Sequence, residues 1–192
     1  MKSINKLLVN VFLLSLIVLI GIELSVDYDF FDRRMALATT AIIAGVAFLV
    51  TNKIVKKKYQ FSLPWFVALA VAFSVWLDAI GNFLYYYTRF GWWDDLAHFS
   101  GSLSAAVLIY YVFYILRKKG ILSLSNFHFS TYVISLVMLF SALYEISEFI
   151  GDLLFEMHRV GPRYDTVSDL TYNLMGAALV VLIGNVLTRR KN

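Results

Sequence analysis

Six long apolar stretches run through this chain of 192 residues and set the limits on its fold. Crossing a hydrocarbon core of about 30 Å takes roughly 20 mainly apolar residues, so each stretch predicts a membrane-spanning helix. Only 16% of the residues are charged, whereas a soluble domain carries about 25%. The predicted fold class is therefore an all-α integral membrane protein, a six-helix transmembrane bundle. The stretches are residues 7–24, 35–52, 61–86, 96–116, 131–154 and 167–187.

The polar breaks between the stretches are short, which predicts one polytopic membrane domain over residues 1–192. The first stretch follows a short basic segment, as in a signal sequence, but no clear small-x-small cleavage site follows it. We therefore predict a retained anchor. The chain has no cysteine, which excludes a disulfide framework and thiolate metal sites. Phosphate-binding loops are missing, and the net charge of +4 suits membrane orientation better than nucleic-acid binding.

Lysine and arginine gather in alternate polar segments, which predicts the orientation. With a cytoplasmic N-terminus, the inside segments hold twelve of the seventeen basic residues. The positive-inside rule then places both termini in the cytoplasm, and we expect a multi-pass protein of a bacterial-type inner membrane. The twelve are Lys2, Lys6, Lys53, Lys56, Lys57, Lys58, Arg117, Lys118, Lys119, Arg189, Arg190 and Lys191.

The acidic residues lie on the opposite side, in outer loops or in the outer parts of the stretches. Helical spacing places polar side chains on one face of each of the last four stretches. Ionisable side chains are costly in lipid, so these faces should turn inward and meet. This predicts a polar chamber, open to the outside, within the four-helix part 75–187. The four faces are Ser74, Asp78, Asn82 and Tyr85; Asp94, His98, Ser102 and Ala105; Ser141, Glu145, Glu148 and Asp152; and Asp165, Asp169, Tyr172 and Gly176.

Eight acids expected around this chamber have few basic neighbours, so either some carboxyls keep a proton or a cation binds. They are Asp78, Asp94, Asp95, Glu145, Glu148, Asp152, Asp165 and Asp169. Sites rich in carboxylates and poor in imidazole suit Mg²⁺, Mn²⁺ or Ca²⁺, with Zn²⁺ a poorer fit. The predicted metal ligands are Asp78, Asp94, Asp95, Glu148, Asp165 and Asp169. The predicted catalytic residues, which can move a proton beside such a metal, are His98, Glu145 and Glu148. The predicted substrate-binding residues are Asn82, Arg163 and Asn173.

Several of these residues also have ordinary structural explanations. Asp94 or Asp95 could cap the helix that begins there. A lone His98 is more often a satisfied polar residue than a ligand. Asp78, Glu145 and Glu148, by contrast, lie in the middle of a stretch, where capping is impossible. An ion pair with arginine could explain one of them but hardly all three, which favours a functional role for them.

Three motifs carry a family resemblance: WDDLAHF at 93–99, LYEISEF at 143–149 and YDTVSD at 164–169. Together they resemble the YjdF-like family of bacterial inner-membrane proteins. More loosely, an ordered set of residues is similar to VanZ-like proteins, namely Asp94, His98, Phe99, Glu145, Arg163, Asp165, Asp169, Asn173 and Gly176. The resemblance covers about residues 75–187 and implies a multispan membrane protein. Through VanZ it also implies an association with low-level glycopeptide resistance.

The leading hypothesis is a small membrane enzyme that acts on a lipid or lipid-linked headgroup at the outer leaflet. It would be a metal-dependent hydrolase or transferase whose partner is membrane lipid. One alternative is a proton- or cation-coupled transporter or an ion-binding membrane protein. Six short helices leave little room for alternating access, an objection that a homodimer would weaken. The other alternative is a structural or accessory membrane protein whose polar cluster only ties helices together.

Overall fold

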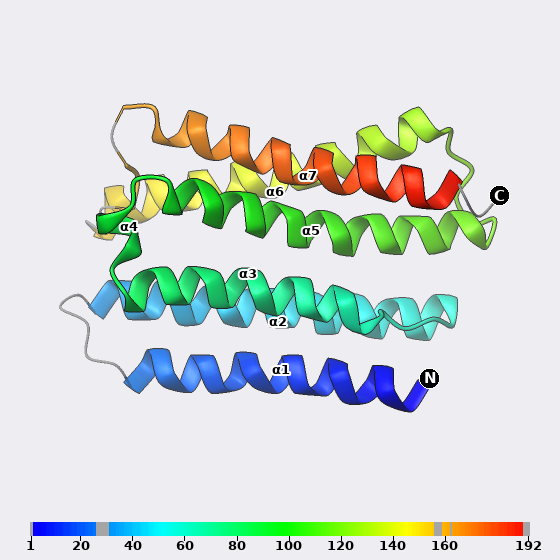
Figure 1. The fold of residues 1–192 in the computed structure, drawn as a ribbon, viewed down its shortest axis with the longest axis horizontal. Helices are drawn as coiled ribbons and strands as arrows, with labels where there is room; N and C mark the ends of the chain where they lie inside the picture. The colour runs from blue at the N-terminus through cyan, green and yellow to red at the C-terminus, as the bar shows by residue number, and fades with distance from the viewer. Residues whose placement is uncertain (1, 26–30, 156–158, 162, 190–192) are drawn as a thin grey trace. The chain divides into compact units, whose positions relative to one another are not determined.

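The computed structural model describes residues 2–25, 31–155, 159–161 and 163–189, and these residues form helices and short connections without a strand. Six of the helices are long and apolar enough to cross a membrane. The structure thus confirms the predicted all-helical membrane fold (Figure 1). The helices are α1 (Lys2–Ser25), α2 (Phe31–Tyr59), α3 (Trp65–Phe83), the short α4 (Tyr86–Arg89), α5 (Trp93–Lys118), α6 (Asn126–Phe155) and α7 (Asp165–Arg189).

The helices differ from the expected stretches at their ends, most at the end of α2 and at both ends of α3. The lysine-rich segment 53–58 was expected as a break between spans, but α2 continues through it to Tyr59. Lysine is a good helix former and can extend its amine toward water from the end of a span, so a charged run need not end a helix. The third span is shorter than expected because Pro64 precedes its first turn and Tyr85, just beyond Phe83, adopts a left-handed φ of 56°.

The chain divides into two compact units, residues 1–93 and 94–192. In the first unit α1 packs against both α2 and α3. Leu19, Phe48 and Val67 are fully buried there. The side-chain oxygen of Asn5 accepts a hydrogen bond of 2.8 Å from the backbone amide of Trp65. Such bonds satisfy the backbone where it leaves helical geometry before α3.

The second unit consists of α5, α6 and α7. Its apolar core contains Tyr110, Phe129, Val133 and Val181, so all three helices contribute to it. Near that core the Tyr110 hydroxyl donates a hydrogen bond of 3.3 Å to Asn185. The Asn185 amide in turn donates one of 3.0 Å to a hydroxyl of α6. Interhelical hydrogen bonds of this kind help to fix helix pairs in a membrane.

Two glycines of α7 allow it to approach α5 closely. A Cβ atom at Gly176 would collide with the backbone oxygen of Phe99, and one at Gly184 would collide with the ring of Tyr110. Small residues at such positions are typical of helix pairs in membranes, because they let backbones come together. Gly176 lies two turns beyond Asp169, so this close approach also positions the first turns of α7 against α5.

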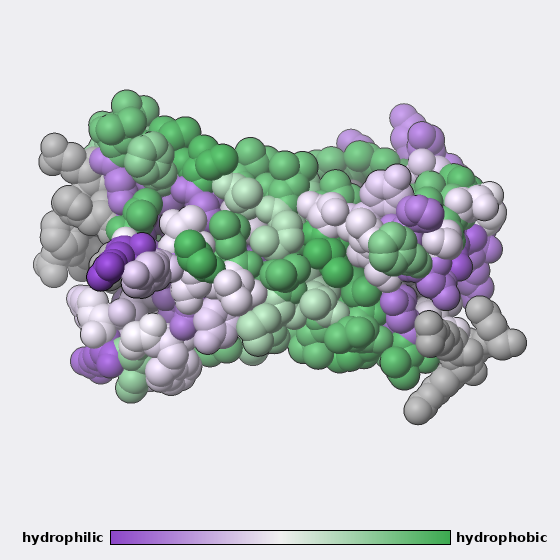
Figure 2. All heavy atoms as spheres, turned by 90° about the horizontal axis from the view of Figure 1, so that it is seen from above, coloured by the Kyte–Doolittle hydropathy of each residue, from purple (hydrophilic) through white to green (hydrophobic). Residues whose placement is uncertain are grey.

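The outer faces of the long helices carry large apolar side chains. Phe73, Phe140 and Leu182 are each more than half exposed. In Figure 2 hydrophobic residues occupy the middle of the visible face, and hydrophilic residues gather toward its ends. A surface of this kind is suited to lipid, because apolar side chains need no partner in a hydrocarbon core.

Candidate functional site

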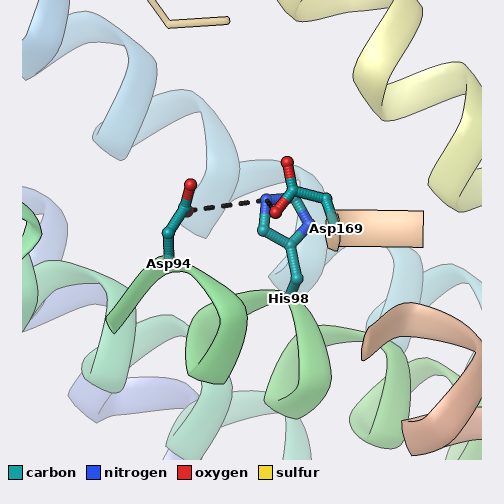
Figure 3. Close-up of side chains that lie close together, drawn as sticks. All are labelled: Asp94, His98 and Asp169. Carbon is teal, nitrogen blue, oxygen red and sulfur yellow. Dashed lines mark ion pairs between the residues drawn. The ribbon is translucent and has the colours of Figure 1, made fainter. Parts of the chain in front are cut away.

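His98, in the second turn of α5, lies at the centre of a cluster of carboxylates in the second unit. Its Nε2 atom lies 3.6 Å from Oδ1 of Asp94 and 3.6 Å from Oδ1 of Asp169. Its Nδ1 atom lies 3.7 Å from Oε1 of Glu145. Figure 3 shows Asp94 and Asp169 directed at the imidazole from α5 and α7. One imidazole therefore meets a carboxylate from each of three helices.

Local helical geometry explains this convergence. Asp94 and His98 are four residues apart on α5, a spacing that places two side chains on one face. On α7, Asp169, Asn173 and Gly176 follow the same periodicity. Because Gly176 allows α7 to approach α5, the two residues before it on that face reach the imidazole, and the Asn173 amide nitrogen lies 3.3 Å from Nδ1 of His98.

Each of two buried carboxylates of this cluster has one oxygen without a hydrogen-bond partner. Asp169 is 2% exposed and Glu145 is 7% exposed. Oδ2 of Asp169 and Oε1 of Glu145 have no hydrogen-bond partner among the residues that the structure describes. Buried polar atoms are nearly always hydrogen-bonded, so each exception requires an explanation. The separations of 3.6–3.7 Å from His98 are too long for hydrogen bonds.

Glu148 has a different environment, because it pairs with an arginine. Nη2 of Arg159 lies 2.8 Å from Oε1 of Glu148 and donates a bond of 2.8 Å to the Tyr144 hydroxyl. Asp152 fixes the segment that carries this arginine, since its carboxylate accepts the backbone amides of residues 159 and 160 at 2.7 and 2.8 Å. The charge of Glu148 is thus balanced within the protein.

Three other predicted site residues of the second unit lie near the ends of α5 and α7. Asp95 accepts a hydrogen bond of 2.6 Å from the hydroxyl of Ser168. Asp165 accepts one of 2.8 Å from the backbone amide of residue 161. Arg163 is exposed and lies over the ring of Tyr164. Neither Asp95 nor Asp165 belongs to a group of potential metal ligands among the described residues, and their predicted metal-binding roles stay predictions.

Asp78 and Asn82, also predicted site residues, belong to the first unit. The Asp78 carboxylate accepts hydrogen bonds from the Tyr87 hydroxyl at 2.7 Å and from the Asn82 amide at 3.1 Å. Both donors are near in sequence, so the arrangement is local to the end of α3 and the segment that follows it. Here a half-buried acid has neutral hydrogen-bond donors rather than a histidine.

Two groups of described residues have the geometry to hold a metal ion. One consists of Asp94, His98 and Asp169, and the other of His98, Glu145 and Glu148. Within each group the potential ligand atoms lie within 4.8 Å of one another. Both groups contain His98. The two aspartates lie nearest its Nε2 atom, and Glu145 lies nearest its Nδ1 atom.

Two residues with notable environments were not singled out from the sequence. Tyr144 lies beside the site, since its ring meets that of His98 edge-on at 6.0 Å and its hydroxyl accepts from Arg159. Its proximity to Glu145 in the sequence was the available signal. Glu23 is 1% exposed near the end of α1, and its Oε2 atom has no hydrogen-bond partner among the described residues. An acid inside the first apolar stretch was the signal for this residue.

Fold and cluster together define a multi-pass membrane protein with a histidine–carboxylate site on its last three helices. The chain belongs to the family described as predicted membrane protein (DUF2238), whose model matches residues 6–190. This match confirms the resemblance to the YjdF-like family and extends it over the first two spans. No curated protein and no solved structure matches the chain.

Proposed function

We propose that this protein is a membrane enzyme that acts on a lipid or lipid-linked headgroup at the outer leaflet. It would be a hydrolase or transferase that uses a divalent cation (Mg²⁺, Mn²⁺ or Ca²⁺) held by acids around His98. The observation that carries the proposal is the convergence of carboxylates from α5, α6 and α7 on one imidazole. A histidine among carboxylates supplies both ligands for a cation and groups that transfer protons.

The depth of the cluster supports a headgroup as the substrate. Asp94 is the second residue of α5 and Asp169 the fifth of α7, so both lie within roughly 8 Å of a helix end at a rise of about 1.5 Å per residue. Lipid headgroups occupy this depth, whereas acyl chains lie further along the helices. The distribution of basic residues supports placing this end at the outer face of a bacterial-type inner membrane, with both termini in the cytoplasm.

The chemistry follows from the groups present. A bound divalent cation would polarise a phosphoryl oxygen of the headgroup and orient the attacking water or hydroxyl. A carboxylate beside the imidazole would accept the proton that the nucleophile loses. We place Arg163 on the substrate side, as an exposed cation just before α7.

A second candidate function has its own support. Glu145 and Asp169 are buried carboxyls within membrane-spanning helices and have oxygens without partners among the described residues, a feature typical of proton and cation pathways. A transporter or ion-binding protein, as a monomer or homodimer, is therefore the alternative. The accessory function rests on the Glu148–Arg159 pair, which ties α6 to the segment after it. The looser VanZ-like similarity would add a link to glycopeptide resistance.

The enzyme proposal is tested by the lipid profile of cells that lack the protein. Complementation with the parent should restore any lipid or lipid-linked intermediate that accumulates, and His98→Gln should fail to do so while folding normally in detergent. His128→Gln is the matched control, because His128 is exposed and contacts Ser125 instead. Identical lipid profiles in deleted and complemented cells would refute the enzyme proposal.

The orientation is tested separately with reporter fusions. A reporter after Asn192 should be active as a cytoplasmic fusion, and one inserted in segment 89–95 as an external fusion. The opposite pattern would place the His98 cluster at the cytoplasmic face and overturn the assignment to the outer leaflet.

A further inference from the structure

The strongest unexplained feature is the carboxylate of Asp169. It is 98% buried, and its Oδ2 atom has no hydrogen-bond partner among the described residues, while Oδ1 points at Nε2 of His98 from 3.6 Å. A buried charge is normally paired or coordinates a metal. Oδ1 of Asp94 lies at the same 3.6 Å distance from the same nitrogen. Two carboxylates therefore flank one nitrogen without a hydrogen bond to it.

These separations are close to those between the ligands of one ion. Metal–ligand bonds of about 2.1 Å place neighbouring ligand atoms about 3.0–3.4 Å apart. Each aspartate oxygen need only approach Nε2 by a few tenths of an ångström for both to share a cation with it, and all three ligand atoms lie within 4.8 Å of one another. We propose that Nε2 of His98 and the carboxylates of Asp94 and Asp169 bind one divalent cation, Mn²⁺ or a cation with similar ligand preferences. Glu145 is then a positioning residue beside the opposite ring nitrogen, Nδ1. This assignment deepens the proposed function, since it names the cofactor and ligands of the same site.

The charges favour this group over the alternative at Nδ1. Two carboxylates and a divalent cation sum to zero charge at the Asp94–His98–Asp169 group. Glu148, in the other group, already pairs with Arg159 at 2.8 Å. A cation placed there would be repelled by a guanidinium next to one of its ligands. Because Glu148 is paired with Arg159, we do not expect it to be a metal ligand. Nε2 is therefore the ring nitrogen that binds the cation.

Access favours the same group. The Asp94 side chain is 38% exposed, whereas those of Glu145 and Glu148 are 7% and 9% exposed. A hydrated cation can therefore reach the Nε2 side through Asp94. The open side would also leave coordination positions for water or for an oxygen of the headgroup, as catalytic metal sites require.

The group on the other ring nitrogen completes the arrangement. A histidine that binds metal through one nitrogen usually donates the N–H of the other to a carboxylate or carbonyl oxygen. Oε1 of Glu145, at 3.7 Å from Nδ1 and without another partner among the described residues, is placed to accept it. The side-chain oxygen of Asn173 can accept the same proton if its amide is turned. Glu145 thus orients the ring and does not bind the cation.

The ligand set selects the cation. Ca²⁺ and Mg²⁺ prefer oxygen ligands throughout, and an imidazole in the set disfavours both. Mn²⁺ accepts carboxylates and imidazole together, while Zn²⁺ sites in proteins usually contain more histidine or cysteine. Mn²⁺ is also paramagnetic, so binding removes the resonance of the free hexahydrated ion. Mn²⁺ is therefore the expected cofactor, and it can also serve as the probe of binding.

The experiment is a titration of the purified full chain in detergent with MnCl₂ near neutral pH, read by electron paramagnetic resonance of the free ion. We expect one Mn²⁺ per chain for the parent. Asp169→Asn and Asp94→Asn should weaken binding by more than about 100-fold, and Glu145→Gln by about 10–100-fold, the range for a partner of a ligand. Asp95→Asn and Glu148→Gln should change it by less than about 3-fold, since neither side chain is a ligand in this assignment.

Each outcome decides the assignment. Loss of binding in Glu148→Gln with retention in Asp94→Asn would overturn it in favour of the Nδ1 group, and a parent that binds no Mn²⁺ would overturn it altogether. A nitrogen coupling to bound Mn²⁺ in pulsed spectra of the parent, absent in His98→Gln, would support it even if Asp169→Asn failed to fold. The lipid profile remains a separate test. Stoichiometric Mn²⁺ binding without a lipid change would support the metal site and refute the proposed enzyme. A His98-dependent lipid change without Mn²⁺ binding would support the enzyme and refute the metal site.

Discussion

The acids of the two compact units have different partners. In the first unit, Asp78 accepts hydrogen bonds from Tyr87 and Asn82, both neutral donors at 2.7–3.1 Å. In the second unit, Asp169 and Glu145 flank His98 at 3.6–3.7 Å and keep oxygens without partners among the described residues. Hydrogen-bonded acids need nothing further, whereas acids that face an imidazole without a bond require a proton or a cation. The contrast separates an acid with a structural role from a candidate site.

The first unit is not uniform in this respect. Glu23 on α1 is also buried and has an oxygen without a partner among the described residues. It belongs to neither group of potential metal ligands. A buried acid outside such a group can remain neutral by keeping its proton, whereas the acids around His98 together form a potential ligand set.

The largest expected effect comes from Arg159→Ala in the second unit. The change leaves the Glu148 carboxylate buried without its counter-ion, so we expect the free energy of unfolding in mixed micelles to fall by about 3 kcal/mol. Combining it with Glu148→Gln should restore most of the loss. Lys58→Ala is the control from the first unit, because Lys58 is exposed over Tyr59 and should cost less than about 0.5 kcal/mol. If Arg159→Ala and Lys58→Ala lowered the free energy of unfolding by the same amount, the pairing of Glu148 with Arg159 would have no special role in stability.

A somewhat smaller effect is expected from Gly176→Ala. The added methyl would meet the backbone oxygen of Phe99, so α5 and α7 must separate at a cost of about 2–3 kcal/mol. Separation would also pull Asp169 away from His98, so Mn²⁺ binding should weaken along with stability. Gly101→Ala provides the comparison, because a Cβ there meets nothing within 4 Å. If the two alanine variants unfolded at the same denaturant concentration, close packing of α7 on α5 would not be what positions the site.

Tyr87→Phe probes the acid of the first unit. Removing the hydroxyl takes away one of the hydrogen bonds to Asp78, which should cost about 1–1.5 kcal/mol. The variant should bind Mn²⁺ with the affinity of the parent, since we assign Asp78 a structural role. Thermal melts and the Mn²⁺ titration on the same sample check both parts. A Tyr87→Phe protein with parent stability but weakened metal binding would make Asp78 part of the metal site, as the sequence suggested.

The smallest expected effect is that of Tyr110→Phe, away from the site in the second unit. Its hydroxyl bonds to Asn185 at 3.3 Å, and such interhelical bonds average about 0.6 kcal/mol in membranes. Metal affinity should be unchanged. A loss as large as that of Gly176→Ala, measured in the same micelles, would show that polar contacts rather than close packing hold α5 to α7.

The fold could be predicted because the number and length of apolar stretches are properties of the linear sequence. The ends of the helices were harder, since the lysines at 53–58 have good helix propensity as well as charge, and α2 therefore runs on to Tyr59. Pro64 and the left-handed Tyr85 shorten the third span. Such boundaries depend on local backbone geometry that hydrophobicity does not report.

The arrangement of the candidate site could be predicted only in part from the sequence. Helical spacing alone places Asp94 beside His98, and it identifies the faces that bear Glu145 and Asp169. It does not say which acids find other partners. Glu148 pairs with Arg159, and Asp95 with a serine hydroxyl, because of how α6, α7 and the segment between them pack. Contacts between residues distant in sequence depend on close approaches such as that at Gly176, which periodicity cannot supply.

We have proposed that His98, Asp94 and Asp169 share one cation. The most direct measurement is an anomalous difference map from crystals of the full chain grown near neutral pH with MnCl₂. We expect one peak in the second unit, about 2.1–2.3 Å from Nε2 of His98 and from an oxygen of each of the two aspartates. A peak beside Glu145 and Glu148 on the Nδ1 side, or a cluster in which only water separates His98 from the carboxylates, would contradict it.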